Sequence, residues 1–165
     1  MFIKKIKRLL EYLTNRTLLK ARLHKLPLAF VEDLIELKSL IPEVNNIFDV
    51  GANDGEFSLA ANYLWPNSYL YLFEPLPDKV IKLNDLLKTR KIKGIVYPFA
   101  LSSNEGSSIF FKYNYDRLSS FLKPDDKLRE YYANQSNYSE IIVDQRKFDN
   151  LFNLSENSSN IVKID

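Results

Sequence analysis

Two short segments in the middle of the chain limit what it can fold into more than any other feature. The first is Phe48–Gly55, with the sequence FDVGANDG, and the second is Phe73-Glu74-Pro75, about one helix and one strand later. A strand that runs into a glycine-containing turn, followed by a strand that ends in an acid, is typical of the nucleoside-binding half of an α/β domain. Together the two segments indicate a cofactor of the nucleoside type.

The apolar pattern around these segments changes repeatedly between a helical period and short strand-like runs. Helices are expected at residues 28–40, 56–64 and 76–90, and core strands at 47–50, 69–73, 95–99 and 161–165. This alternation predicts an α/β fold, a sandwich with a mainly parallel sheet, preceded by N-terminal helices. Helices should cover both faces of such a sheet, and ligands should bind at the carboxyl ends of its strands.

The second half of the chain has a less regular pattern. A turn at Asn104-Glu105-Gly106 should open a strand at 107–113, and a loop should follow at 119–121. Residues 124–139 show no clear period, which indicates a loop or a short helix. A further strand is expected at 141–143 and a short helix at 148–154.

Composition limits the chemistry that the chain can use. The 165 residues suit one domain, which we divide into an N-terminal helical segment at 1–45 and an α/β part at 46–165. The chain has no cysteine, so disulfides, cysteine-ligated metals and a cysteine nucleophile are excluded. His24 is the only histidine and lies in a basic segment, where a solvated surface position is expected. No metal site is predicted.

The N-terminal segment carries most of the positive charge of the chain. Residues 1–25 hold eight lysines and arginines against Glu11 alone, and the remainder is acidic on balance, so nucleic-acid binding is not expected. Apolar residues at helical spacing in 2–23 fit either a helix packed on the domain or on a partner subunit, which we favour, or a basic helix at an anionic membrane surface. The segment resembles no secretion signal, and we expect a cytoplasmic protein, peripheral at the membrane under the second interpretation.

The glycine pattern distinguishes between two kinds of nucleoside cofactor. Gly51 permits a sharp bend after the strand, and Gly55 permits close packing of the following helix on the strand. The spacing Gly51-x-x-x-Gly55 lacks the G-x-G-x-x-G pattern of a pyrophosphate site. Asp49 would repel a pyrophosphate but suits a cationic ligand, and the Glu74 carboxylate suits two ribose hydroxyls. These features favour S-adenosylmethionine over NAD.

The order of the motifs resembles that of the FkbM family of S-adenosylmethionine-dependent methyltransferases. The resemblance runs from about Ile47 to Asp165. It implies that the α/β sandwich is a Rossmann-like fold of the class I methyltransferase kind, with residues 46–165 as a partial methyltransferase domain. It rests on the segments Phe48–Gly55, Phe73–Pro77, Pro98–Ser102, the strand after Gly106, Ser119-Ser120, Lys147-Phe148-Asp149 and Val162–Asp165.

The resemblance implies roles for individual residues. Asp49, Gly51, Ala52, Asn53 and Gly55 would contact the methionine part of the cofactor. Glu74 would hold the ribose beside Pro75, and Ala100 and Leu101 would lie near the adenine.

The resemblance also implies methylation of a hydroxyl group on a sugar or another small metabolite. Asp165 is the candidate general base, with ligand positioning or helix capping as its other role. Ser119 and Ser120 either orient this acceptor or shape their loop. Nothing in the sequence indicates an oligomeric state.

The sequence stops at Asp165, the last residue of the fourth core strand, where the family pattern continues. We therefore expect a version of the domain that lacks its C-terminal part. A non-catalytic module that binds the cofactor is the alternative function, and an NAD-dependent enzyme is a third.

Overall fold

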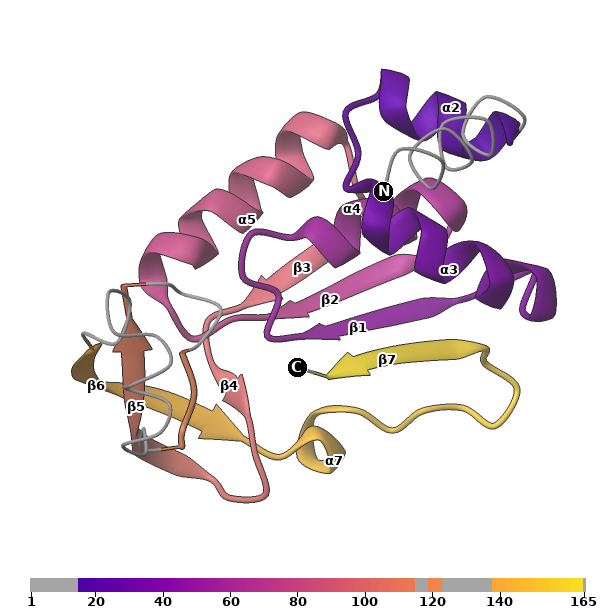
Figure 1. Cartoon of the computed structure of the whole chain (residues 1–165). Coiled ribbons are helices and arrows are strands. Elements are labelled where there is room, and N and C mark those ends of the chain that lie inside the picture. Colours follow the sequence, from indigo (N-terminus) through magenta and orange to yellow (C-terminus); the bar gives the residue numbers. More distant parts are fainter. Residues whose placement is uncertain (1–14, 115–118, 123–137, 165) are drawn as a thin grey trace.

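The computed structural model of the chain describes residues 15–114, 119–122 and 138–164 (Figure 1). It is an α/β structure with two sheets. In chain order its elements are α2 (Arg16–Leu23), α3 (Leu28–Leu40), β1 (Asn46–Val50), α4 (Glu56–Leu64), β2 (Tyr69–Phe73), α5 (Pro77–Arg90), β3 (Gly94–Tyr97), β4 (Ala100–Leu101), β5 (Gly106–Tyr113), β6 (Tyr138–Arg146), α7 (Phe148–Leu151) and β7 (Asn160–Ile164).

The main sheet contains the four core strands that the sequence predicts. Its order is β3-β2-β1-β7, and every neighbouring pair is parallel. Val50 at the end of β1 lies opposite Phe73 of β2 and Ile164 of β7. The carboxyl ends of three strands are therefore level, and the turns that follow them meet at one edge of the sheet.

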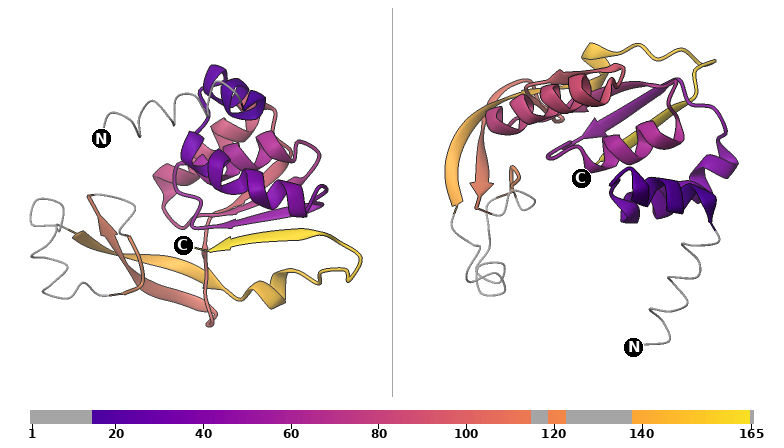
Figure 2. Two further views of the ribbon diagram at one scale, coloured as in Figure 1. Left: turned by 45° about the vertical axis from the view of Figure 1, so that its right-hand side comes forward. Right: turned by 90° about the horizontal axis from the view of Figure 1, so that it is seen from above.

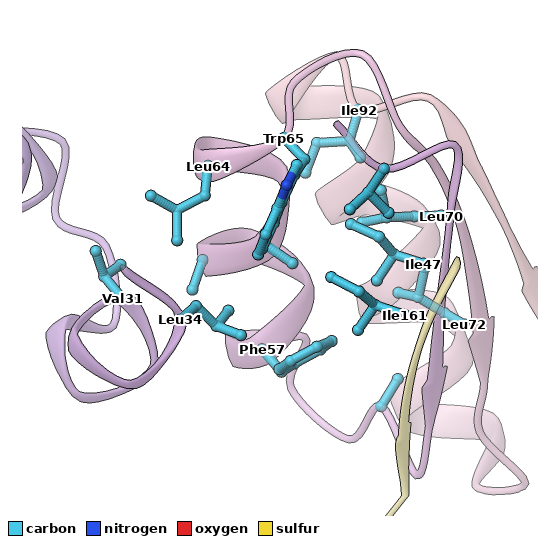
Figure 3. Packing of buried hydrophobic residues seen from close by; sticks show 14 of the residues in the cluster. Val31, Leu34, Ile47, Phe57, Leu64, Trp65, Leu70, Leu72, Ile92 and Ile161 are labelled. Carbon is cyan, nitrogen blue, oxygen red and sulfur yellow. The ribbon is translucent and has the colours of Figure 1, made fainter. Parts of the chain in front are cut away.

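Helices α3, α4 and α5 cover one face of the main sheet (Figures 1 and 3). Ile47, Leu70 and Leu72 point from the strands into this layer and are fully buried. Val31 and Leu34 of α3 belong to the same hydrophobic cluster, so the helical segment before β1 contributes to the core of the domain. The boundary between residues 45 and 46 stays a prediction.

An aromatic cluster covers the other face of the main sheet. Phe48 stacks on Tyr71 with ring centroids 4.8 Å apart, and Phe148 and Phe152 each pack edge-on against Phe48 at 5.1 Å. Among the described residues, the only helix on this face is the four-residue α7. The expectation of helices on both faces is therefore met only in part.

The second sheet has the order β4-β6-β5 and extends to one side of the main sheet (Figure 2). The predicted strand at 95–99 is divided between the two sheets, since β3 ends at Tyr97 and β4 begins at Ala100. Pro98 has no amide hydrogen for a strand ladder, which explains why β3 ends before it. Ala100 then pairs with Gln145 of β6.

Other boundaries differ from the prediction for similar reasons. The strand predicted at 141–143 is the longer β6, because β5 pairs with it from Gly106 opposite Gln145 to Tyr113 opposite Tyr138. The helix predicted at 148–154 ends at Leu151. Helix α5 begins at Pro77, one residue after the predicted start, and β7 is described as far as Ile164.

The N-terminal basic segment is described only from Asn15. The side chain of Asn15 accepts hydrogen bonds from the N–H groups of Thr17 and Leu18, so it caps α2. Most of the segment 2–23 lies outside the described residues, and its contact with a membrane or a partner stays a prediction. No helix among residues 15–114, 119–122 and 138–164 has the length and apolar character of a membrane span.

We predict that Gly94→Ala destabilises the main sheet. A Cβ atom at Gly94 would lie 2.6 Å from the carbonyl oxygen of Leu70, and a backbone atom cannot move away as a side chain does. We expect a loss of about 1–3 kcal/mol in the free energy of unfolding, measured by urea denaturation. Lys93→Ala at the neighbouring exposed position is the control and should change stability by less than about 0.5 kcal/mol. Equal stability of both variants would contradict the prediction.

Candidate functional site

A cavity of about 460 Å³ lies at the carboxyl edge of the main sheet, between this sheet and the strands β4 and β5. This volume is in the range of small-molecule sites. Nine residues that the sequence predicts for the site line the cavity: Gly51, Ala52, Asn53, Glu74, Pro75, Ala100, Leu101, Ser119 and Ser120.

The segment Gly51–Gly55, which we call the glycine turn, connects β1 to α4 and forms one side of the cavity. Gly51 and Gly55 have φ near +73°, and Asn53 has φ of +47°, so the turn uses left-handed conformations that glycine and asparagine adopt most readily. The N–H groups of Gly51 and Ala52 both donate to the carbonyl oxygen of Phe73, at 3.0 and 3.1 Å. These bonds fix the turn to the end of β2.

Gly55 has a packing role that differs from the expected one. A Cβ atom there would lie 2.6 Å from Leu86 and 2.9 Å from Leu83, both on α5. Gly55 therefore allows α5 to approach the start of α4, whereas the sequence suggested packing on the strand. Gly55 is outside the cavity wall, and its contact with a ligand stays a prediction.

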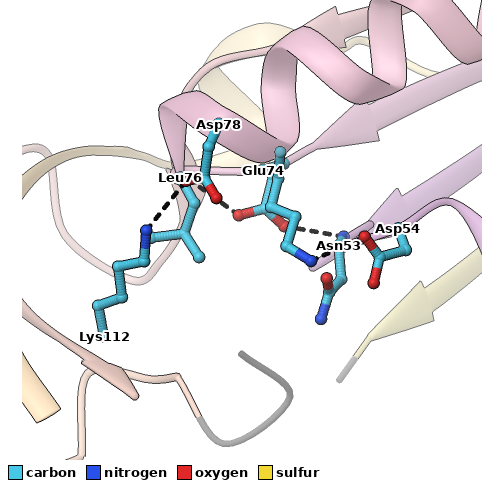
Figure 4. A network of polar contacts seen from close by, with 7 residues as sticks. Asn53, Asp54, Glu74, Leu76, Asp78 and Lys112 are labelled. Atoms are coloured by element: carbon cyan, nitrogen blue, oxygen red, sulfur yellow. Dashed lines mark hydrogen bonds and ion pairs between the residues drawn. The ribbon is translucent and has the colours of Figure 1, made fainter. Parts of the chain in front are cut away.

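Glu74 joins the glycine turn to the start of α5 (Figure 4). Its two carboxylate oxygens accept hydrogen bonds from the N–H groups of Asn53, at 2.8 Å, and Leu76, at 2.9 Å. The residue is only 4% exposed, and burial raises the pKa of its carboxyl above the ordinary value. The two N–H donors and the Lys79 ammonium act in the opposite direction on this pKa. Each oxygen keeps a lone pair for a ligand hydroxyl in the cavity.

Two ion pairs connect the elements around Glu74 (Figure 4). The buried Lys79 of α5 contacts Asp54 of the glycine turn at 2.7 Å. Asp78, also on α5, accepts a hydrogen bond from Lys112 of β5 at 3.0 Å, which holds the pKa of Asp78 below its ordinary value. The glycine turn, α5 and the second sheet are thus linked around one side of the cavity.

The Asp49 carboxylate is buried beneath the glycine turn. One oxygen accepts a hydrogen bond from the Ser58 hydroxyl at 2.6 Å, and the other lies 3.1 Å from the Lys163 ammonium. Asp49 is not among the residues that line the cavity. The sequence predicts that the Asp49 carboxylate contacts a cationic ligand. In the structure this carboxylate has two protein partners, Ser58 and Lys163, and its direct contact with the ligand stays a prediction.

Several residues of the cavity wall were not predicted from the sequence. Lys163 lines the cavity from β7, and Phe30 and Phe57 line it from α3 and α4. The rings of Phe30 and Phe57 pack edge-to-face at 6.2 Å. The sequence does contain a signal for Lys163. It is a lysine within an apolar strand, and a cation in a buried strand needs a partner. Phe30 carries no comparable signal.

Asn53, Ser119 and Ser120 present polar atoms in the wall. The side-chain oxygen of Asn53 is buried and accepts no hydrogen bond from the described residues, so it can receive one from a ligand. The Ser119 and Ser120 hydroxyls accept hydrogen bonds from the N–H groups of Tyr113 and Leu122, at 3.0 and 3.1 Å. Both serines therefore shape their loop as well as lining the cavity.

The candidate base, Asp165, lies outside the described residues. Within the described part of the chain, no group of three or more His, Asp or Glu side chains is arranged to hold a metal ion.

The comparisons with known proteins agree with the cavity and its motifs. Residues 49–165 match the family described as the methyltransferase FkbM domain. Neither the curated proteins nor the solved structures contain a match. The matched region includes the glycine turn, Glu74, β4, both serines and β7, which together make up most of the cavity wall. Since the match covers more than half of its length, the chain belongs to the FkbM methyltransferase family.

Proposed function

We propose that this chain binds S-adenosylmethionine in the cavity and methylates a hydroxyl group of a sugar or another small metabolite. Membership of the family supports a methyltransferase, and the activity, the donor and the acceptor are our inference. The observation that carries the proposal is the position of Glu74, a buried acid that faces the cavity from the end of β2 while its oxygens are fixed by two backbone N–H groups.

The arrangement around Glu74 supports a nucleoside ligand. A carboxylate accepts hydrogen bonds from two neighbouring ribose hydroxyls, and its orientation is set before the ligand arrives, which limits the entropy lost on binding. Ala100 and Leu101 form an apolar part of the wall beyond Pro75, suited to the adenine ring. The unmatched oxygen of Asn53 suits the ammonium group of the methionine part.

The glycine turn argues against a dinucleotide. The N–H groups of Gly51 and Ala52 are engaged by Phe73, and that of Asn53 is engaged by Glu74. A pyrophosphate site needs such N–H groups for its oxygens. Glu56 also lines the cavity and would oppose a pyrophosphate anion.

The protein contributes mainly alignment in the proposed reaction. When bound, S-adenosylmethionine supplies an electrophilic methyl carbon for in-line transfer to the acceptor oxygen. Holding the two reactants in line contributes up to about 7–11 kcal/mol in favourable cases. In our proposal Ser119 and Ser120 orient the acceptor, and Asp165 takes the hydroxyl proton as general base.

We predict that affinity for S-adenosylmethionine increases with pH through the raised pKa of Glu74. The ionised carboxylate accepts from both hydroxyls, whereas the protonated form has lost acceptor capacity, so binding favours the ionised form. Glu74→Gln should weaken binding by about 1.5–3 kcal/mol and remove this pH dependence. Calorimetric titrations with S-adenosylmethionine at several pH values test both expectations.

Titration with NAD provides the ligand control for this experiment. Binding of S-adenosylmethionine and not NAD by the wild type supports the proposed cofactor. Wild-type affinity in Glu74→Gln, or the same pH profile in both proteins, would refute the role of Glu74. A folded wild-type chain that binds neither ligand would contradict the proposed function.

We also predict that Phe30→Ala weakens the binding of S-adenosylmethionine. Phe30 contributes an aromatic wall from a helix outside the matched region, and its loss exposes that side of the cavity to water. We expect a loss of about 1 kcal/mol, or roughly fivefold in affinity, by calorimetry. Leu37→Ala, on the same helix but outside the cavity wall, is the control for loss of stability alone. Equal affinities of the two variants would remove Phe30 from the binding site.

A further inference from the structure

Lys163 makes three contacts with consecutive residues at the end of β1. Its ammonium lies 3.1 Å from the Asp49 carboxylate and donates to the carbonyl oxygens of Val50, at 3.3 Å, and Gly51, at 3.0 Å. Lys163 lies directly opposite Asp49 in the parallel register of β7 and β1. The ammonium therefore makes two hydrogen bonds to backbone carbonyls and one ion pair with the carboxylate.

The burial of this group makes its partners energetically important. The Lys163 side chain is 15% exposed and that of Asp49 is 1% exposed. A charge in such surroundings is stable only with an opposite charge and hydrogen bonds. The Ser58 hydroxyl donates a hydrogen bond to the other Asp49 oxygen, so the carboxylate is contacted from α4 as well as from β7.

The glycine turn is consequently held from two sides. Its N–H groups at Gly51 and Ala52 donate to Phe73 of β2, and the Gly51 carbonyl accepts from Lys163 of β7. These contacts fix the peptide planes on both sides of Gly51, a residue whose positive φ gives it wide conformational freedom. Without the Lys163 contact, the turn would lose its hydrogen bond to β7 and keep its hydrogen bonds to β2.

We propose that Lys163 is the positioning residue of the glycine turn, holding the Val50 and Gly51 carbonyls in place with Asp49 as its counter-ion. The ligand of the turn is that of the proposed function, but the positioning itself does not depend on which ligand binds.

Amide hydrogen exchange of the ligand-free protein tests the positioning. The variants are Lys163→Met, Asp49→Asn and the double variant Asp49→Asn/Lys163→Met. We expect Lys163→Met to raise exchange at Gly51 and Ala52 by about tenfold or more relative to core amides such as Leu72. Lys112→Met, which breaks the exposed ion pair with Asp78, is the matched control and should leave this ratio unchanged.

The double variant separates positioning from charge balance. Lys163→Met alone leaves the buried Asp49 charge without its cation and lowers the stability of the whole domain. The double variant removes both charges, so exchange at core amides should return toward the wild-type rate. Exchange at Gly51 and Ala52 should stay fast, because the two carbonyls still lack their donor. Wild-type protection of these amides in the double variant would overturn the proposal.

Titration with S-adenosylmethionine and with its product S-adenosylhomocysteine, which among its charges lacks only that of the sulfonium, tests the consequence for binding. If Asp49 acts through Lys163 and the turn, Asp49→Asn should change both affinities by similar factors, within about threefold of each other. A selective loss of the cationic ligand would show that Asp49 faces the sulfonium directly. If the wild type binds neither compound, the proposed function fails, and the exchange experiment still decides the role of Lys163.

Discussion

The attachment of the glycine turn to both neighbours of β1 is the constraint on which the rest of the site depends. Phe73 on one side accepts from two N–H groups of the turn, and Lys163 on the other side donates to its carbonyls. Only a central strand of a parallel sheet has two neighbours that end level with it. The turn in its fixed conformation directs the Asn53 N–H to Glu74, so the orientation of the acid follows from the register of the sheet.

Two buried acids at this edge of the sheet illustrate how surroundings decide the use of a side chain. Asp49 faces the helical layer, where Ser58 and Lys163 engage its oxygens. Glu74 lies one residue beyond β2 and accepts hydrogen bonds from two backbone N–H groups, with its carboxylate at the cavity. A full ion pair makes Asp49 part of the framework. The two N–H donors and Lys79 offset only part of the effect of burial on Glu74, so its pKa stays raised and its oxygens can still accept hydrogen bonds from a ligand. A shifted pKa of this kind is typical of functional groups.

The sequence was sufficient for the main sheet because local signals and the final structure agree there. The periods of the apolar residues, together with Gly51 and Pro77, locate α4, α5 and the core strands within one or two residues. Local signals fail where a distant partner decides the structure. The length of β6 depends on pairing with β5, and the ion pair of Asp49 depends on a lysine of the last strand. Phe30 reaches the cavity only because α3 packs on α4, which no motif in its own helix indicates.

The contribution of α3 to the cavity wall makes ligand binding and the docking of this helix thermodynamically linked. A ligand that touches Phe30 binds better to molecules in which α3 is packed on α4 than to molecules in which it has separated. By reciprocity, the ligand stabilises the docked helix by the same free energy by which docking of the helix strengthens the binding of the ligand. Helix α3 would therefore report occupancy of the cavity, since its local opening would become rarer as the cavity fills.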